Sequence, residues 1–146
     1  MMRQRGFTLI EIIMVLVLAV VIYAVLLAIP MRGTSVADLK ASARVLASGL
    51  RQAQTMAMAT RQDAVLMVDL DTREFLMPGE TEPRKLPDGI DLKLYTAQSE
   101  VTSDKRGGIR FYPDGSSTGG RITVASGERK FLVDVDWLTG RVSIGD

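Results

Sequence analysis

The stretch RGFTLIEIIMVLVLAVVIYAVLLAIP, residues 5–30, holds the longest apolar run of the chain and determines its architecture. Of its 26 residues, 21 are hydrophobic, and Glu11 is the only charged residue after Arg5. As a helix, this run is long enough to cross the roughly 30 Å hydrocarbon core of a bilayer. Arg3 and Arg5 precede the run, so the positive-inside tendency places the N-terminus in the cytoplasm. The sequence therefore predicts a single-pass transmembrane helix over residues 7–30.

The composition of the whole chain excludes several classes of function. Histidine and cysteine are absent, which excludes histidine acid/base chemistry, thiol catalysis, disulfides, and zinc or iron–sulfur sites built on those ligands. The net charge of +1 gives no overall attraction to nucleic acid or acidic substrates. Outside residues 7–29, 47 of 123 residues, or 38%, are hydrophobic, a proportion that suits one small domain.

Two ordinary interpretations of the apolar segment leave features unexplained. A secretory signal peptide has a shorter apolar core and a small-residue cleavage site, whereas residues 28–31 read Ala-Ile-Pro-Met. A plain signal anchor fits the length and orientation but gives no reason for Glu11. An ionised carboxylate inside a membrane helix costs a few kcal/mol and is usually paired and functional. A third interpretation has to account for Glu11 and the Gly6–Phe7 junction together.

The residues from Arg5 to Glu11, RGFTLIE, resemble the type III signal of type IV pilins and type II secretion pseudopilins. The resemblance implies that residues 1–6 are a leader peptide with a basic charge from Arg3 and Arg5. It further implies that a prepilin peptidase cleaves between Gly6 and Phe7, and that Phe7 becomes the N-methylated mature N-terminus. The apolar segment would then remain in the mature protein, with Glu11 at its fifth position.

The chemistry of the junction agrees with that resemblance. Gly6 supplies the small, flexible residue that cleavage requires, and cleavage leaves an amine on Phe7 close to the bilayer. In a helical stack of subunits, this amine can pair with Glu11 of a neighbour, which offsets two charges that are costly to leave alone in lipid. The plainer alternative is a carboxylate that extends to the membrane surface without a partner.

Residues 31–61 are predicted to form the amphipathic, periplasmic part of the N-terminal helix. Pro30 is expected to kink or loosen the helix, with Thr34 or Ser35 as the new N-cap, a weakening at Gly49 and an end near residue 61. Apolar residues then recur at steps of three and four: Val36, Leu39, Ala43, Leu46, Leu50, Ala53 and Ala57. We expect this seam to pack on the chain's own sheet, rather than in a coiled coil with another chain.

Residues 62–146 change to short β-type runs separated by turns and are predicted to form a periplasmic β-rich domain. Polar loops are expected at 78–87 and 100–108, and Trp137 is expected to make the largest contribution to the core. The predicted strands cover residues 64–70, 73–77, 90–95, 109–112, 121–125, 130–136 and 141–144. The predicted fold class is α+β and type IV pilin-like, with a long N-terminal transmembrane helix packed against an antiparallel sheet.

The segment 111–120, FYPDGSSTGG, is rich in glycine, and a glycine-rich loop can bind phosphate. It lacks the Gly-Lys-Ser/Thr ending of a P-loop and does not open a helix, so its glycines are expected to form turns. Together with residues 50–54, LRQAQ, the segment resembles the GspH/FimT-type minor pseudopilins. The two resemblances cover both ends of the mature chain.

The predicted domain offers no recognisable catalytic or metal site. Ser116 and Ser117 have no histidine or lysine partner in a known catalytic pattern. Asp134, Asp136 and Asp146 could suggest calcium, but alternate spacing on a strand places the first two more simply on the solvent side. The chain is therefore expected to be no enzyme and to hold no cofactor and no metal.

The resemblance implies a minor pseudopilin that acts by assembly near the tip of a short periplasmic filament and supports protein export across the outer membrane. The expected partners are the other minor pseudopilins, the major pseudopilin, the prepilin peptidase, the inner-membrane secretion platform and inner-membrane lipid, with secreted proteins as further candidates. The alternative is a minor type IV pilin of the FimT/FimU kind, for pilus priming or DNA uptake. From residue 36 onward, 15 basic and 16 acidic residues are dispersed, so nucleic acid is not an expected partner.

Overall fold

The computed structural model describes residues 8–28 and 35–146, without the side chains of 25–28. The predicted leader, the Gly6–Phe7 junction and the expected break at Pro30 lie outside the described residues. The chain divides into two compact units, Met1–Arg32 and Gly33–Asp146.

The first unit contains the helix α1, Leu9–Ala28, which confirms the helical prediction for this segment. Its first turn is closed by the carbonyl of Thr8, which accepts from the backbone N–H of Glu11 at 3.0 Å and of Ile12 at 3.3 Å. The described side chains of α1 are exposed, and they are apolar on every side apart from Glu11. Among the residues that the structure describes, no helix is both long enough and apolar enough to count as a membrane span.

The second unit begins with the helix α2, Val36–Thr60, whose ends match the predicted ones. Ser35 is the N-cap: its hydroxyl accepts from the backbone N–H of Asp38, while the Asp38 carboxylate accepts from the N–H and hydroxyl of Ser35. This reciprocal capping satisfies donors that the first turn of a helix leaves free. Arg61 ends the helix in the left-handed conformation, with φ of 56°.

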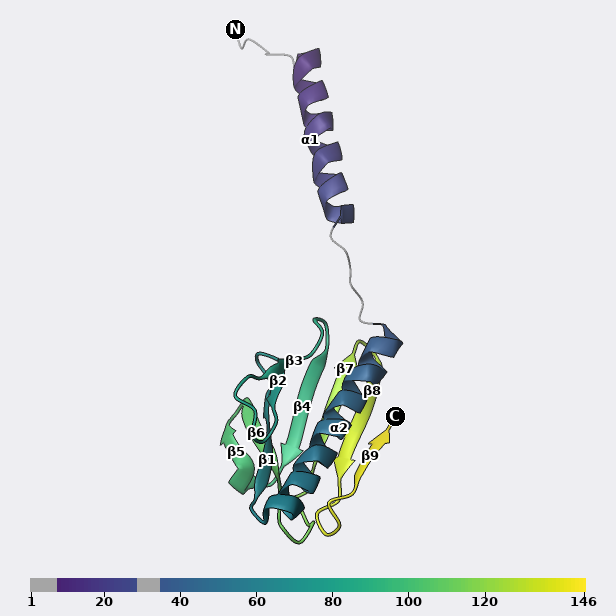
Figure 1. Cartoon of the computed structure of the whole chain (residues 1–146). Coiled ribbons are helices and arrows are strands. Elements are labelled where there is room, and N and C mark those ends of the chain that lie inside the picture. The colour runs from purple at the N-terminus through teal and green to yellow at the C-terminus, as the bar shows by residue number, and fades with distance from the viewer. Residues whose placement is uncertain (1–7, 29–34) are drawn as a thin grey trace. The chain divides into compact units, whose positions relative to one another are not determined.

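Two antiparallel sheets follow α2 (Figure 1). One has the strand order β3-β2-β1-β6-β5, and the other has the order β4-β7-β8-β9. A short 3-10 helix, Gln98–Glu100, precedes β5. The strands are β1 Ala64–Asp69, β2 Glu74–Leu76, β3 Arg84–Lys85, β4 Asp91–Thr96, β5 Val101–Ser103, β6 Arg106–Phe111, β7 Gly120–Ser126, β8 Arg129–Val135 and β9 Val142–Gly145. Helix α2 contacts strands of both sheets, so it closes one core between them.

The apolar seam of α2 faces this core, which confirms packing on the chain's own sheets. Six of its seven residues are buried: Leu39, Ala43, Leu46, Leu50, Ala53 and Ala57. Val36, at the start of the helix, is the exception at 41% exposure. Gly49 does not weaken the helix. It lies where an added Cβ would come within 3.0 Å of Leu66 Cδ1, so the absence of a side chain lets β1 approach α2 closely.

The prediction for Trp137 was wrong, because its side chain is 66% exposed. The alternation of buried residues along β8 stops at Val135, where the strand ends and a turn begins. The largest fully buried side chains are instead Phe75 on β2 and Phe111 on β6.

The two predicted polar loops were also partly wrong. Region 78–87 contains β3, which pairs with β2, and region 100–108 contains β5 and the start of β6. Glu100 is buried, and both its oxygens accept from Arg110, at 2.9 Å from Nε and 3.3 Å from Nη2. The Glu100 carboxylate raises the pKa of Arg110. A charge-assisted pair therefore orders a segment that its polar composition had suggested was a loop.

Candidate functional site

Glu11 is the one predicted assembly residue that lies within the described part of the chain. It occupies the first turn of α1, where a negative charge interacts favourably with the helix dipole, and its side chain is exposed. The sequence of α1 contains no lysine or arginine, so an ionic partner for Glu11 has to come from outside this helix. Arg3, Arg5, Gly6 and Phe7 lie outside the described residues.

A second candidate region lies where the C-terminal half of α2 meets two turns of the β domain. The side-chain amide of Gln54 donates from Nε2 to the carbonyl of Gly115 at 2.8 Å and to that of Thr139 at 3.0 Å. One helical side chain thus connects the loop between β6 and β7 with the turn between β8 and β9. We call this arrangement the Gln54 bridge. Gln54 lies in the motif LRQAQ, but no local sequence pattern indicates that its side chain connects two turns.

The glycine-rich loop between β6 and β7 is a structural turn, as the sequence predicted. Its backbone N–H groups donate to groups within the domain: Tyr112 to Ser116 O, Gly115 to Tyr112 O, Ser116 to Asp114 Oδ1, Ser117 to Trp137 O, Thr118 to Arg110 O and Gly119 to Ser117 Oγ. Gly115 and Gly119 adopt positive φ, at 88° and 72°. Because these donors are already used, the loop offers no row of free N–H groups for a phosphate.

The turn after β8 presents Trp137 and Leu138 to solvent. Asp136 forms this turn: its Oδ1 accepts from the backbone N–H groups of Leu138 and Thr139, at 3.1 and 2.8 Å, and from the Thr139 hydroxyl. The hydrogen bonds from Thr139 lower the pKa of Asp136 most, followed by the one from Leu138, with a smaller contribution from Arg141. The exposure of Trp137 therefore results from a fixed turn.

Replacing Asp136 with asparagine is expected to lower the Tm of the β domain at pH 7. An amide oxygen still accepts these hydrogen bonds but carries no charge, and charge-assisted bonds are the stronger ones. Because the folded pKa of Asp136 lies below its ordinary 3.8, its contribution is present above about pH 4 and is lost as pH falls further. The Tm difference between wild type and Asp136→Asn, measured by circular dichroism, should shrink from pH 5 to pH 2.5. A difference that stays constant with pH would contradict this assignment.

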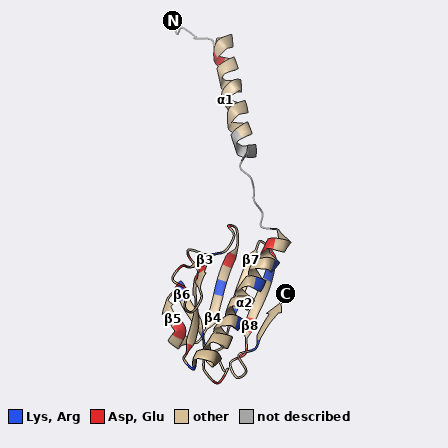
Figure 2. Cartoon of the chain, viewed as in Figure 1, with Lys and Arg blue, Asp and Glu red and all other residues tan. Residues whose placement is uncertain are grey.

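The basic residues of the β domain are largely paired with carboxylates, and both charge signs are mixed over the unit (Figure 2). Arg106 pairs with Asp69, Lys105 with Asp71, Arg84 with Glu80, Arg121 with Asp134, and Arg110 with Glu100 and Asp63. Paired cations are less available to neutralise phosphates than free ones.

Two of the three aspartates considered for calcium are used in other contacts. Asp134 pairs with Arg121, and Asp136 accepts bonds within its own turn. Within residues 8–28 and 35–146, no group of three or more acidic side chains is arranged to hold a metal ion.

An apolar N-terminal helix carrying one carboxylate, together with a second helix buried against two antiparallel sheets, defines a pilin-like α+β protein. Solved structures agree with this class. The minor pseudopilin EpsH from the type 2 secretion system of Vibrio cholerae matches with a TM-score of 0.57 and 16% identity, over 73% of this chain and 95% of that one. The type IV minor pilin FimU of Pseudomonas aeruginosa matches with a TM-score of 0.56 and 12% identity, over 74% of this chain and 88% of that one. At these identities, both matches show the fold alone.

Sequence comparisons identify the family. Residues 42–139 match the family model described as type II transport protein GspH, and residues 1–29 match the prokaryotic N-terminal methylation motif. The chain is 30% identical to type II secretion system protein H of Xanthomonas campestris pv. campestris, over 98% of this chain and 84% of that protein. The chain belongs to the GspH family of type II transport proteins.

Proposed function

We propose that this chain is made as a prepilin, that its leader of residues 1–6 is removed, and that Phe7 is then N-methylated. The observation that carries this proposal is the N-terminal methylation motif over residues 1–29, which includes Gly6, Phe7 and Glu11. The absence of histidine and cysteine supports a role in assembly, because a structural subunit needs neither.

The mature chain is proposed to be anchored in the inner membrane by residues 7–30, with its N-terminus cytoplasmic and residues 62–146 periplasmic. The structure describes residues 8–28 of this segment, and the described side chains are apolar around the helix apart from Glu11. A helix that is apolar on every side has no polar face to turn to water, which favours burial in lipid or among other helices. Arg3 and Arg5 supply the charge bias for the orientation.

In the filament, we propose that α1 packs among the helices of other pseudopilins while the β domain contacts minor pseudopilins near the tip. The prepilin peptidase and the secretion platform are the proposed membrane partners, and secreted proteins are further candidates. Two features support a role for the β domain in contacts: the exposed Trp137 and Leu138, and the fixed turn that presents them. Exposed aromatic residues on rigid elements are frequent contact points in protein interfaces.

The mass of the N-terminal peptide tests the first step. The protein should be extracted from the membranes of cells that contain a prepilin peptidase and digested for mass spectrometry. A peptide that starts at N-methylated Phe7 is the expected result. An intact Met1 start in those cells would contradict the prepilin assignment, and a strain lacking the peptidase provides the control.

Pilus priming or DNA uptake has less support as an alternative. The likeness to FimU is a likeness of fold, whereas the family model and the curated relative both belong to type II secretion. This alternative can be tested by a salt-dependent DNA shift assay on the full chain in mild detergent. Tight DNA binding would favour DNA uptake over type II secretion as the function.

A further inference from the structure

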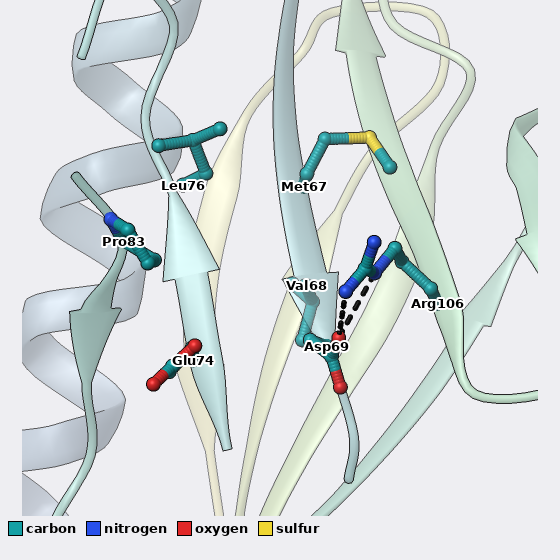
Figure 3. Close-up of a pocket in the computed structure, with 7 residues that line it drawn as sticks. All are labelled: Met67, Val68, Asp69, Glu74, Leu76, Pro83 and Arg106. Atoms are coloured by element: carbon teal, nitrogen blue, oxygen red, sulfur yellow. Dashed lines mark hydrogen bonds and ion pairs between the residues drawn. The ribbon is translucent and has the colours of Figure 1, made fainter. Parts of the chain in front are cut away.

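The outer face of the sheet that contains β1 and β2 has a hollow of about 260 Å³ (Figure 3). Four apolar residues line one part of it: Met67 and Val68 on β1, Leu76 on β2, and Pro83 just before β3. Three charged side chains line the rest: Asp69, Glu74 and Arg106. We call this hollow the β1–β2 pocket.

The apolar part of the pocket follows from strand register. Met67 lies opposite Leu76 on one side and Gly108 of β6 on the other. Gly108 has no side chain, and an added Cβ would lie 2.9 Å from Met67 Sδ. The row Gly108–Met67–Leu76 is therefore apolar, and the missing side chain at Gly108 lets the Met67 thioether lie close to β6.

The next row along the same strands carries the charges. Asp69 lies opposite Arg106 on β6 and opposite Glu74 on β2. Arg106 Nε donates to Asp69 Oδ2 at 2.9 Å, and the backbone N–H groups of Asp71 and Thr72 donate to Asp69 Oδ1. These contacts, with the Arg106 hydrogen bond the largest, lower the pKa of Asp69, so this carboxylate is ionised at neutral pH. Arg106 is thus neutralised by Asp69.

Glu74 is left as the uncompensated charge of the pocket. Among the described residues, no lysine or arginine nitrogen lies within ion-pair distance of its carboxylate. Its register partner on β3, Lys85, pairs with Asp88 at 3.7 Å instead. Asp69 is directly across the strand pair, and like charges in this position repel. The three charged side chains of the pocket sum to −1.

We propose that the β1–β2 pocket binds a lysine or arginine side chain of a partner protein. The aliphatic stem lies against Met67, Leu76 and Pro83, and the cationic end pairs with Glu74. Long basic side chains combine an apolar stem with a charged head, which matches the two parts of the pocket. An anionic ligand would be repelled by Glu74, and Arg106 is already paired with Asp69. An apolar side chain would remove Glu74 from water without giving its carboxylate a partner, which costs free energy. The inference goes beyond the proposed function, because this chemistry does not depend on the filament in which the chain assembles.

A titration on the full chain in mild detergent micelles tests the proposal. Methionine methyl groups carry ¹³C, and the Met67 signal is assigned from a Met67→Leu variant. The probes are the peptides acetyl-Gly-Gly-Lys-Gly-Gly-amide and the same peptide with norleucine in place of lysine. We expect the lysine peptide to shift the Met67 signal saturably, with an affinity about two- to fivefold higher than that of the norleucine peptide, the range of an exposed ion pair.

Glu74→Gln keeps the size of the side chain and removes its charge, so it should abolish the preference for lysine over norleucine. Glu128→Gln is the matched control, because Glu128 is exposed in the turn between β7 and β8 of the other sheet. The control should retain the wild-type preference, and the methyl spectra should show that both variants are folded. The proposal is overturned if Met67 gives no saturable shift, if both peptides bind wild type equally, or if Glu74→Gln keeps the preference.

Discussion

Replacing Glu11 with alanine is expected to leave leader cleavage intact and to reduce incorporation into the filament by about tenfold or more, since an unpaired charge in lipid costs a few kcal/mol. In the proposed assembly, Glu11 pairs with the N-methylated amine of a neighbouring Phe7. The substitution leaves that amine without a partner in the apolar interior. Cleavage precedes assembly and acts at Gly6–Phe7, so it does not require the pair.

The measurement compares two quantities in the same cells: the N-terminal mass of the membrane-extracted protein, and the amount of the chain in sheared filaments. Glu11→Asp is the control, because it keeps the charge on a shorter side chain and should restore part of the incorporation. If Glu11→Ala enters filaments at the wild-type level, Glu11 has no role in assembly. If its leader is retained, the substitution acts at processing instead.

Replacing Gly140 with alanine is expected to destabilise the β domain by about 3 kcal/mol or more, through left-handed strain together with overpacking. Gly140 has a φ of 62°, and an added Cβ would overlap Gln54 Nε2 and the carbonyl oxygen of Gly115. Both atoms belong to the Gln54 bridge. The substitution therefore displaces the amide that connects α2 to the two turns, in addition to straining the backbone.

Gly127→Ala provides a matched control for this experiment. Gly127 has almost the same φ, 60°, but nothing lies within 4 Å of the position of an added Cβ. The Gly127→Ala substitution should lower the free energy of unfolding only by the strain of the left-handed backbone, about 1–2 kcal/mol. Urea unfolding of the full chain in mild detergent, followed by the strand signal in circular dichroism, gives the two free energies. Equal losses for the two variants would show that the Gln54 bridge contributes nothing to stability.

Local patterns predicted the helices and most strands because those elements depend on nearby residues. The apolar run after Phe7 predicted α1, and the three- and four-residue steps from Leu39 to Ala57 predicted the buried face of α2. Ser35 followed by Asp38 three residues later is a local capping pattern, and it forms. The motif RGFTLIE predicted the pilin-like class, which the methylation motif confirms, and residues 50–54 and 111–120 predicted the GspH family, which the GspH model confirms.

The predictions from the sequence were wrong where contacts between residues distant along the chain determine the local structure. Region 100–108 was predicted to be a loop from its polar composition, but strand pairing with β1 and the buried Glu100–Arg110 pair order it. Trp137 was predicted to lie in the core, but the hydrogen bonds of Asp136 turn the chain after Val135. Short-range hydrophobic patterning cannot indicate where a strand stops pairing.

The apolar segment, its single carboxylate and the leader motif are properties of consecutive residues, so the sequence alone determined the pilin-like class and the candidate assembly residues. The Gln54 bridge and the β1–β2 pocket unite residues that are distant along the chain, such as Gln54 with Thr139 and Asp69 with Arg106. Their contacts exist only after strand register and helix packing have been set. For that reason only the tertiary structure could show that Glu74 remains uncompensated while the cations around it are already paired.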